Sequence, residues 1–251
     1  ACVLCKRHDP NAESLFATVG VHPTRCNEFL SAPKNHLVEL SNLIQNNLDR
    51  VVAVGEIGLD FNEERLKFCD AETQIEFFDA QLSLARAHKL PCFLHMREAA
   101  EKFCGILSVN GDVLQYGAVT HSFTGTKEEA DLILDLHYNM YIGLNGCSFK
   151  TEENCEVAKH IPLERMMIET DSPYCDIRPT HFGYQYVKTK FDAVRKPEKW
   201  VAGKQVKGRN EPCNVIQVAE VIAGLKGISV QDVARVTVEN TMKVFKLAAR
   251  K

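Results

Sequence analysis

Short apolar runs alternate with amphipathic stretches along most of this chain. The runs are rich in Val, Ile, Leu and Phe and lack polar alternation, which is typical of strands buried on both faces of a parallel sheet. They cover Leu15–Val21, Val51–Val54, Pro91–Leu94, Gly117–Thr120, Met140–Leu144 and Met166–Ile168. Strands that alternate with helices predict an α/β fold, either a βα barrel or an open doubly wound sheet.

The stretches between the runs carry apolar residues at helical spacing. Their stripes are Leu37, Leu40, Ile44 and Leu48; Ile75, Phe78, Leu82 and Ala85; Val215, Val218 and Ile222; and Val233 and Val236. Thr126 and Glu129 have the spacing of a capping box that begins a helix, and Ser229 is a candidate N-cap for the last helix. The segment Ala1–His8 is typical of the end of an amphipathic helix.

Polar residues follow the apolar runs at the point where each predicted strand ends. Five runs lead into His22, Glu56, His95, His121 and Asp171, and the remaining run ends in Asn145. In a TIM barrel the C-terminal ends of the strands surround one cavity, where active sites are built. An open sheet would concentrate its site at one switch point instead. The pattern therefore favours the barrel.

These strand-end residues point to metal chemistry. One histidine at a strand end is more often a hydrogen-bonded loop residue than a ligand, but three histidines and two carboxylates in the same position are hard to explain by packing. Burying them unpaired would cost several kcal/mol, so the cluster indicates mutual compensation or a cation. Mixed nitrogen and oxygen ligands suit Zn²⁺ or Mn²⁺ readily and Mg²⁺ less well. A pair of ions bridged by a carboxylate would hydrolyse phosphate or amide bonds.

Six motifs in order carry a family resemblance. They are Gly20-Val-His-Pro23, Gly55-Glu-Ile-Gly-Leu-Asp60, Leu94-His-Met-Arg97, His121-Ser-Phe-Thr-Gly125, Glu169-Thr-Asp-Ser-Pro173 and Arg209-Asn-Glu-Pro212. Together they resemble the TatD family of metal-dependent deoxyribonucleases. His22-Pro-Thr-Arg-Cys26 and Asn145-Gly-Cys-Ser148 are similar to its eukaryotic TATDN1-like branch. The resemblance implies an amidohydrolase-like TIM barrel and cleavage of DNA phosphodiesters, often from the 3′ end, with links to DNA repair.

The resemblance also implies roles for individual residues. The metal ligands would be Glu56, His95, His121 and Asp171, with Glu56 bridging two divalent ions, Mg²⁺ or Mn²⁺, that Zn²⁺ could replace in crystals. Glu56 and Asp171 would be the catalytic residues, and Asp171 would orient or deprotonate the attacking water. The substrate-binding candidates are His22, Arg97, Ser122, Thr124 and Arg209.

Some of these candidates have equally ordinary interpretations. Arg97 could clamp a phosphate oxygen or be a solvated loop arginine. Ser122 and Thr124 lie between a strand and a helix start, where backbone N–H groups favour an anion. Glu211 could orient a metal ligand, although pairing with Arg209 is the simpler role.

One departure from the family pattern concerns the first strand. Many members carry a His-x-His pair there, and no such pair occurs in this sequence. Counting back from Glu56, the first visible run would be the third strand of the barrel. We therefore expect a single domain over residues 1–251 that lacks its first two strands, either because they lie upstream or because the molecule is truncated.

The charge is distributed unevenly. Lys and Arg number 30 against 33 Asp and Glu, giving a net charge of −3 that provides no overall attraction to nucleic acid. Residues 187–209, here called the basic segment, hold eight basic and two acidic residues, together with Phe191 and Trp200. Within a basic insertion at about 178–209, this segment could hold the backbone of single-stranded or nicked DNA and stack a base. Alternatively, it is a solvated insertion with Trp200 anchored in the core.

The ten cysteines bear on localisation. Only Cys2 and Cys5 form a CxxC pair, so a zinc ribbon is not indicated. Without a secretory signal we expect free thiols in a cytoplasmic or nuclear protein that is not secreted, the nuclear location following from the family alone. No apolar run approaches the roughly 20 residues that span a bilayer.

Two other functions remain open beside the DNase. One is a metal-dependent hydrolase of a small amide, lactone or phosphoester, which would not need the basic segment. The other is a catalytically weakened DNA-binding relative that has lost one metal, a possibility supported by the missing histidine pair. The sequence does not distinguish exonuclease from endonuclease action.

Overall fold

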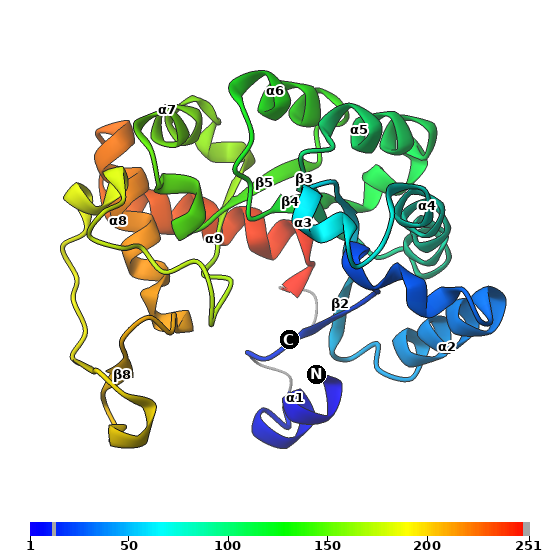
Figure 1. The fold of residues 1–251 in the computed structure, drawn as a ribbon, viewed down its shortest axis with the longest axis horizontal. Coiled ribbons are helices and arrows are strands. Elements are labelled where there is room, and N and C mark those ends of the chain that lie inside the picture. Colours follow the sequence, from blue (N-terminus) through cyan, green and yellow to red (C-terminus); the bar gives the residue numbers. More distant parts are fainter. Residues whose placement is uncertain (12–13, 248–251) are drawn as a thin grey trace. The chain divides into compact units, whose positions relative to one another are not determined.

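A computed structural model describes residues 1–11 and 14–247 of the chain (Figure 1). Six strands form one sheet in which the strand order follows the sequence. They are β1 (Ala17–Val19), β2 (Val51–Asp60), β3 (Cys92–Arg97), β4 (Ala118–His121), β5 (Met140–Leu144) and β6 (Met166–Ile168). The pairs β1–β2, β2–β3, β3–β4 and β5–β6 are parallel, as the uninterrupted apolar runs predict.

Helices separate the strands, and further short elements follow β6. The α-helices are α1 (Cys2–His8), α2 (Pro33–Gln45), α3 (Glu63–Leu66), α4 (Ala71–His88), α5 (Ala100–Val109), α6 (Lys127–Asp135), α7 (Glu152–His160), α8 (Val215–Lys226) and α9 (Val230–Val244). The 3₁₀ helices are η1 (Pro23–Phe29), η2 (Gly111–Tyr116), η3 (Gly146–Phe149), η4 (Leu163–Arg165), η5 (Phe182–Tyr186), η6 (Pro197–Lys199) and η7 (Pro212–Asn214). The short strands β7 (Ala193–Val194) and β8 (Gln205–Val206) pair with each other.

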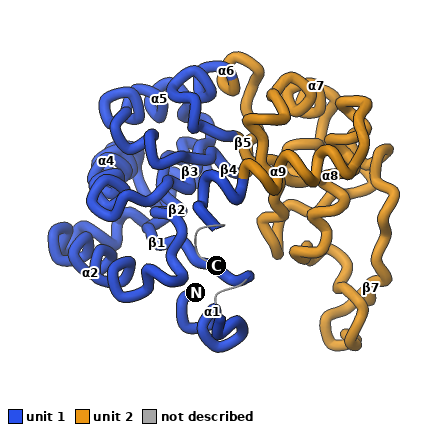
Figure 2. Tube along the Cα trace, turned by 180° about the vertical axis from the view of Figure 1, so that it is seen from behind, with its two compact units in different colours: residues 1–121, 131–141, 241–251 blue, residues 122–130, 142–240 orange. Residues whose placement is uncertain are grey.

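The chain divides into two compact units (Figure 2). Unit 1 comprises residues 1–121, 131–141 and 241–251, and unit 2 comprises residues 122–130 and 142–240. The expectation of a single domain over the whole chain stays a prediction.

The core of unit 1 forms where α4 packs against β2 and η1. Phe77 stacks on Phe29 of η1 with ring centroids 4.5 Å apart, and Phe78 stacks on Phe103 of α5 at 5.5 Å. All four rings are at most 2% exposed. Burying such rings supplies much of the free energy that holds a helix on a sheet.

The core of unit 2 forms where α8 packs against α7 and β6. Apolar residues of α8 such as Val221 and Ile222 are fully buried, as the predicted stripe requires. Asn240 adds a polar anchor, because its side-chain amide donates to the backbone carbonyls of Leu163 at 3.0 Å and Met166 at 2.7 Å. These bonds hold the end of α9 against the segment that leads into β6.

Both predicted helix caps are confirmed. The Glu129 backbone N–H donates to Thr126 Oγ1 at 3.2 Å while the Glu129 carboxylate accepts from the Thr126 N–H at 2.8 Å, which is a complete capping box. Ser229 Oγ accepts from the Asp232 N–H at 3.0 Å. Among the described residues, no single helix is long and apolar enough to cross a membrane; only α8 with η7 and α9, bent by 113°, reach that length together.

Four strands differ from their predicted bounds. The third strand continues beyond Leu94 to Arg97, and the fourth is shifted by one residue to Ala118–His121. The first strand is shorter, covering only Ala17–Val19.

The second strand is longer and continues from Val51 to Asp60, because its pairing with β3 resumes after Glu56 and runs from Ile57 to Asp60. Glycines and polar residues end an apolar run in the sequence, but the backbone hydrogen bonds between strands form whatever the side chains are. Glu56 and His95 therefore lie inside strands and not after their ends, and His121 is the last residue of β4.

Candidate metal centre

A bulge in β2 sets the position of Glu56. Gly55 pairs with Phe93 of β3 and Ile57 pairs with Leu94, so Glu56 is the extra residue between them. Such a bulge redirects a side chain relative to the regular alternation of the strand. Gly58, with φ +145°, is required nearby because a Cβ there would overlap the backbone carbonyl of His95. The sequence thus brings β2 unusually close to β3 beside the predicted ligands.

Three histidine rings surround the Glu56 carboxylate within unit 1. His121 Nε2 lies 2.7 Å from Glu56 Oε1, His95 Nδ1 lies 2.8 Å from it, and His22 Nε2 lies 3.4 Å from it. Nitrogen and oxygen atoms of His22, Glu56 and His95 all lie within 4.8 Å of one another, close enough to ligate one metal ion. The structure therefore gathers three predicted metal ligands, and it adds His22, which had been predicted to bind substrate.

The electrostatics of this cluster favour an ionised carboxylate. Burial raises the pKa of Glu56, but hydrogen bonds from His121, His22 and His95 outweigh it and hold the pKa well below its usual range. Burial lowers the pKa of His95, whereas its contacts with Asp60 and Glu56 raise it, with a net upward shift. The site thus concentrates negative charge and imidazole nitrogens, which is the donor set that a divalent cation needs.

Asp60 is a member of the site that the sequence analysis missed. Its carboxylate is 2% exposed and lies 3.2 Å from His95 Nε2, on the side of the ring opposite Glu56. A carboxylate behind an imidazole fixes which nitrogen carries the proton. Without a metal both ring nitrogens of His95 face a carboxylate, which is why its pKa is raised; with a metal bound, the Asp60 contact would keep the proton on Nε2 and leave the Nδ1 lone pair for the ion. The available signal was that Asp60 ends the Gly55–Asp60 motif that contains Glu56.

Two buried glutamines of α4 hold the strand ends that carry these groups. Gln81 accepts from the Val21 N–H at 2.7 Å and donates to the Val21 carbonyl at 3.2 Å, next to His22. Gln74 makes the same pair of bonds with the backbone of Asp60, at 2.8 Å and 3.0 Å. Both side chains are fully buried. Each amide satisfies the backbone N–H and C=O of one residue that would otherwise be left unpaired.

His22 is oriented by its own turn. It precedes η1 and caps it, because His22 Nδ1 accepts from the Thr24 N–H at 3.2 Å and lies 2.8 Å from Thr24 Oγ1. The ring of His22 meets that of His95 edge-on, with centroids 4.7 Å apart. Because Thr24 occupies Nδ1, Nε2 is the nitrogen that faces Glu56.

Asp171 belongs to unit 2 and is described there. It follows β6 with φ +53°, and its Oδ2 lies 3.3 Å from Cys175 Sγ. Asn210 holds the surrounding loop, because its backbone N–H donates to the Pro173 carbonyl at 3.0 Å and its side chain donates to the Thr170 carbonyl at 2.8 Å. Asn210 lies in the Arg209–Pro212 motif, but nothing in the sequence indicated this contact.

Ser122 is part of a polar cluster in unit 2. Its backbone N–H donates to Glu169 Oε1 at 2.6 Å, and Asn145 Nδ2 lies 2.9 Å from Ser122 Oγ and 3.1 Å from Glu169 Oε1. The amide expected to face an anion therefore already faces a carboxylate of the chain. Thr124 is exposed nearby. The substrate-binding roles of both residues stay predictions.

The two predicted arginines are exposed and have acidic neighbours. Arg97, in unit 1, lies 3.9 Å from Glu98. Arg209, in unit 2, lies 3.4 Å from Glu211, which is the simpler of the two roles considered for Glu211. Both guanidinium groups are more than two-fifths exposed, so each can exchange its carboxylate partner for a phosphate at little cost.

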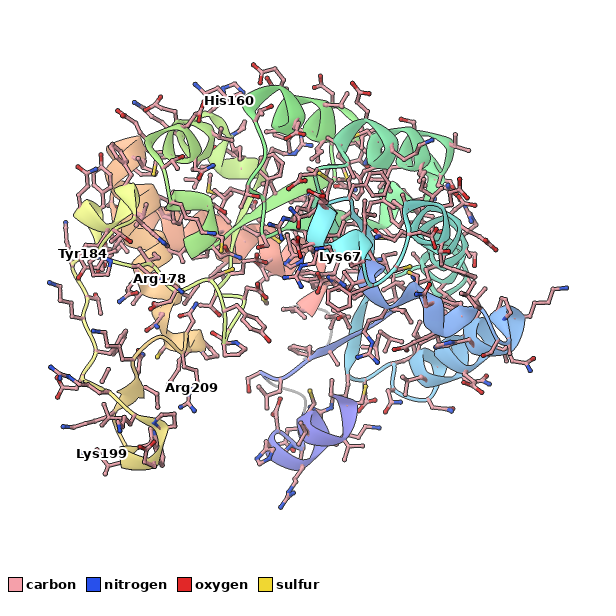
Figure 3. All side chains as sticks on the ribbon, viewed as in Figure 1. Lys67, His160, Arg178, Tyr184, Lys199 and Arg209 are labelled. Carbon is pink, nitrogen blue, oxygen red and sulfur yellow. The ribbon has the colours of Figure 1, made fainter. Side chains whose placement is uncertain are left out.

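The basic segment, residues 187–209, extends away from α8 in both views of unit 2 (Figure 1 and Figure 2). Trp200 is 52% exposed, so its proposed anchoring in the core is wrong, and Phe191 is 40% exposed. Buried Glu220 of α8 holds the start of the segment by accepting from the backbone N–H groups of Lys188 at 2.8 Å and Thr189 at 3.0 Å. Figure 3 shows the side chains of Lys199 and Arg209 on this segment.

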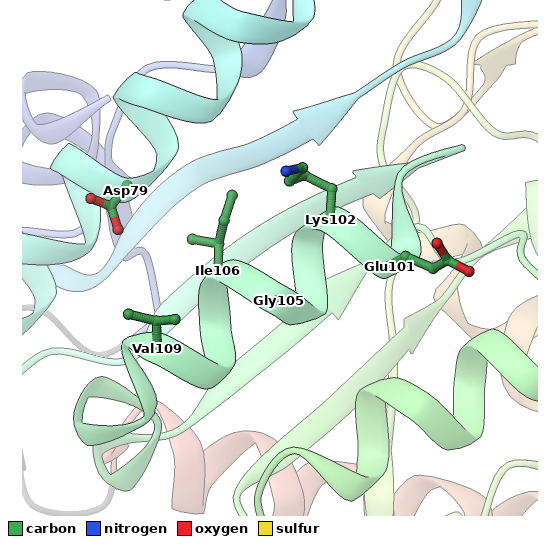
Figure 4. A pocket seen from close by; sticks show the side chains of 6 residues that line it. All are labelled: Asp79, Glu101, Lys102, Gly105, Ile106 and Val109. Atoms are coloured by element: carbon green, nitrogen blue, oxygen red, sulfur yellow. The ribbon is translucent and has the colours of Figure 1, made fainter.

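A separate hollow of about 490 Å³ lies on unit 1 between α4 and α5 (Figure 4). Its lining residues are Asp79, Glu101, Lys102, Gly105, Ile106 and Val109. It contains none of the predicted site residues, and its lining combines opposite charges with aliphatic side chains. It therefore does not compete with the histidine cluster as the reactive site.

A parallel α/β sheet with three imidazoles around a strand carboxylate is an arrangement that could hold a metal ion in a hydrolase. The model of the family described as TatD related DNase matches residues 4–246, and the chain belongs to this family. The predicted family and its amidohydrolase-type TIM-barrel fold are thereby confirmed.

Individual relatives agree with this assignment. The chain is 42% identical over 242 residues to "Deoxyribonuclease Tat-D" of Schizosaccharomyces pombe, covering 94% of this chain and 76% of the relative. It is 33% identical to "3'-5' ssDNA/RNA exonuclease TatD" of Rahnella sp., covering 98% and 82%. The solved structure of a hydrolase TatD family protein from Entamoeba histolytica superposes with a TM-score of 0.86 at 38% identity, covering 97% of this chain and 79% of that one.

Proposed function

We propose that this protein is a divalent-metal-dependent nuclease that hydrolyses DNA phosphodiester bonds, acting as a 3′–5′ exonuclease. The observation that carries the proposal is the convergence of His22, His95 and His121 on one oxygen of Glu56. The name of the Rahnella relative, a 3′–5′ exonuclease for single-stranded DNA and RNA, supports the polarity.

The donor set of the cluster fits a divalent cation. Without a metal, His95 and His121 must each direct a proton toward the same Glu56 oxygen, at 2.8 Å and 2.7 Å. A cation would use the same nitrogen lone pairs and carboxylate oxygen without those protons. Imidazole with carboxylate suits Zn²⁺ and Mn²⁺ readily and Mg²⁺ less well. We assign His22, Glu56, His95 and His121 as the residues of unit 1 that hold the metal, with Asp171 of unit 2 as the further predicted ligand for a second ion.

The residues of the chain then have distinct roles in the reaction. When bound, the metal supplies a water whose pKa is lowered toward neutrality and a positive charge for the phosphate oxygens. Glu56 keeps its carboxylate ionised, because its imidazole neighbours hold its pKa low. Asp60 orients His95. Asp171 is the predicted residue that would orient the attacking water and accept its proton.

The basic segment supports DNA as the substrate. Its eight basic residues and two acidic residues give a local charge of +6 in a chain whose total is −3. Exposed Trp200 and Phe191 are available to stack on unpaired bases, which is how single strands are held without sequence preference. Arg97, Ser122, Thr124 and Arg209 remain proposed contacts for the substrate.

We also propose a reducing compartment, nuclear or cytoplasmic, as the place of action. All ten cysteines lie in the described part of the chain, and none of them forms a disulfide there. This state is typical of proteins kept under cellular reductants.

The test is cleavage of single-stranded oligonucleotides labelled at the 5′ or the 3′ end, with Mn²⁺, Mg²⁺ or chelator. We expect metal-dependent shortening from the 3′ end. Asp171→Ala and Glu56→Gln should each slow cleavage by about 100-fold or more. Glu64→Gln, a change of an exposed carboxylate in α3, is the matched control and should cleave normally.

Metal binding measured by calorimetry separates the alternatives. Wild-type protein that binds Mn²⁺ and cleaves small phosphoesters but not DNA would support the small-molecule hydrolase. Protein that binds DNA and leaves it intact with every metal would indicate the catalytically weakened relative. Glu56→Gln protein that binds Mn²⁺ as tightly as wild type would contradict the assigned metal centre.

A further inference from the structure

Two cysteines of unit 2 face each other beside the Asp171 loop. Cys147 lies in η3 and Cys175 lies in the loop that follows β6, and their Sγ atoms are 2.8 Å apart. Gly146 makes this approach possible, because a Cβ at that position would overlap the backbone carbonyl of Cys175. Two backbone segments that are far apart in sequence are thus held with their thiols face to face.

The environment of this pair differs from that of a second pair in unit 1. Cys147 and Cys175 are both partly exposed, whereas Cys26 and Cys69 are almost completely buried. The hydrogen-bonding contact with Cys175 and the charge of Lys150 lower the pKa of Cys147, although burial opposes them. Burial raises the pKa of Cys26 to about 12. Small polar oxidants can therefore reach the first pair and not the second.

We propose that Cys147 and Cys175 form an oxidisable dithiol, a modification site at which hydroperoxides produce a disulfide. Cys147 thiolate attacks one peroxide oxygen, the O–O bond breaks, and hydroxide leaves, forming sulfenic acid on Cys147. Cys175 sulfur then attacks the Cys147 sulfur, the S–O bond breaks, and the departing hydroxide takes the Cys175 proton. In total, two thiols and one hydrogen peroxide give one disulfide and two waters, and a dithiol reductant reverses the oxidation.

The modification would act on the loop that carries Asp171. In the reduced protein, Cys175 Sγ lies 3.3 Å from Asp171 Oδ2 as a hydrogen-bond donor. A disulfide removes that donor and ties η3 to the loop. Resting on the proposed function, we infer that oxidation slows DNA cleavage by changing the position of Asp171.

The experiment begins with the reduced full-length chain treated with hydrogen peroxide. Free thiols are then blocked, the protein is digested without reductant, and cross-linked peptides are identified by mass spectrometry. We expect a Cys147–Cys175 peptide that appears before any other cross-link and disappears with dithiothreitol. Cys26 and Cys69 should remain unmodified. A first cross-link between other cysteines, or oxidation of Cys147 that proceeds to sulfinic acid without a cross-link, would overturn the proposal.

Matched variants connect the chemistry to activity. Cys147→Ser should retain the cleavage rate of the reduced wild type and lose all sensitivity to peroxide. Cys213→Ser, which removes an exposed thiol at η7, should remain as sensitive as wild type. If Cys147→Ser stays peroxide-sensitive, the dithiol is not the responsive site. Reduced protein that forms the cross-link but never cleaves DNA would contradict the proposed nuclease while leaving the dithiol proposal intact.

Discussion

Replacing Asp60 with asparagine tests whether a carboxylate behind His95 controls the metal site. Asp60 is 2% exposed and its Oδ2 lies 3.2 Å from His95 Nε2. The asparagine amide has nearly the same shape but can present an N–H donor toward a ring nitrogen that must donate. In the metal-bound protein the favourable arrangement would then reverse the tautomer, so that Nδ1 carries the proton and has no lone pair for the ion. We expect weaker metal binding in a protein that still folds.

The size of the effect follows from the role of the contact. Partners that orient a ligating imidazole contribute about 10–100-fold to metal affinity. At about 1.4 kcal/mol for each factor of ten, the Asp60→Asn change should cost about 1.4–2.8 kcal/mol of binding free energy. The fold should tolerate it, because Gln74 anchors Asp60 through its backbone N–H and carbonyl and not through its carboxylate.

The assay is calorimetric titration with Mn²⁺, combined with ¹⁵N spectra of the histidines to report which nitrogen carries the proton. Asp49→Asn is the matched control, since Asp49 is also in unit 1 but its side chain is 54% exposed. The reasoning is refuted if Asp60→Asn protein has a normal urea midpoint and binds Mn²⁺ within a factor of two of wild type. An unchanged His95 tautomer in that variant would refute it independently.

Three further substitutions test the supports of the site. Gln81→Leu should lower the free energy of unfolding by about 2–4 kcal/mol in urea titrations, because it leaves the buried N–H and carbonyl of Val21 unpaired. Glu220→Gln should cost about 1–2 kcal/mol at pH 7. Burial raises the pKa of Glu220, but the Thr189 hydroxyl and backbone N–H lower it by more, so the pKa is lower in the folded protein than in the unfolded one. The difference in unfolding free energy between wild type and Glu220→Gln should therefore be complete above about pH 4.5, and it should vanish as the pH falls through the pKa of folded Glu220. Denaturation measured as a function of pH checks this. Asn210→Ala should reduce kcat for cleavage about tenfold with little change in KM, since it loosens the loop of Asp171.

The strands and helices were largely predictable because burial leaves a direct mark on the sequence. Met140–Leu144 and Met166–Ile168 were predicted with their observed bounds, since each is an apolar run closed by polar residues. The full length of β2 was not predictable from the same rule. Gly55 and Gly58 weaken an apolar pattern, yet they are the residues that allow β2 to run against β3 beyond Glu56. The glycines that ended the predicted strand are therefore the residues that allow the site to form.

The ligand candidates were predictable because burying imidazole and carboxylate side chains at strand ends costs free energy unless they pair with one another or bind a cation. Which of these candidates lie together in one cluster was harder to predict. His22 lies in the cluster with Glu56 because the turn of η1 fixes its ring through Thr24, a local geometry that no spacing rule contains. Asp60 was missed because it lies six residues beyond the end of the predicted run Val51–Val54, where an acidic residue is usually a solvated turn residue.

The amide side chains that support the site were the hardest feature to predict from the sequence. Gln74 and Gln81 are separated by seven residues, which is two turns of α4, so one face of the helix carries both. Each pairs with the N–H and carbonyl of a single residue, Asp60 or Val21, at the point where a strand stops pairing. A carboxylate could only accept there and a lysine could only donate, whereas an amide does both. The positions of His22 and Asp60 are therefore fixed by α4 as much as by the strands that precede them.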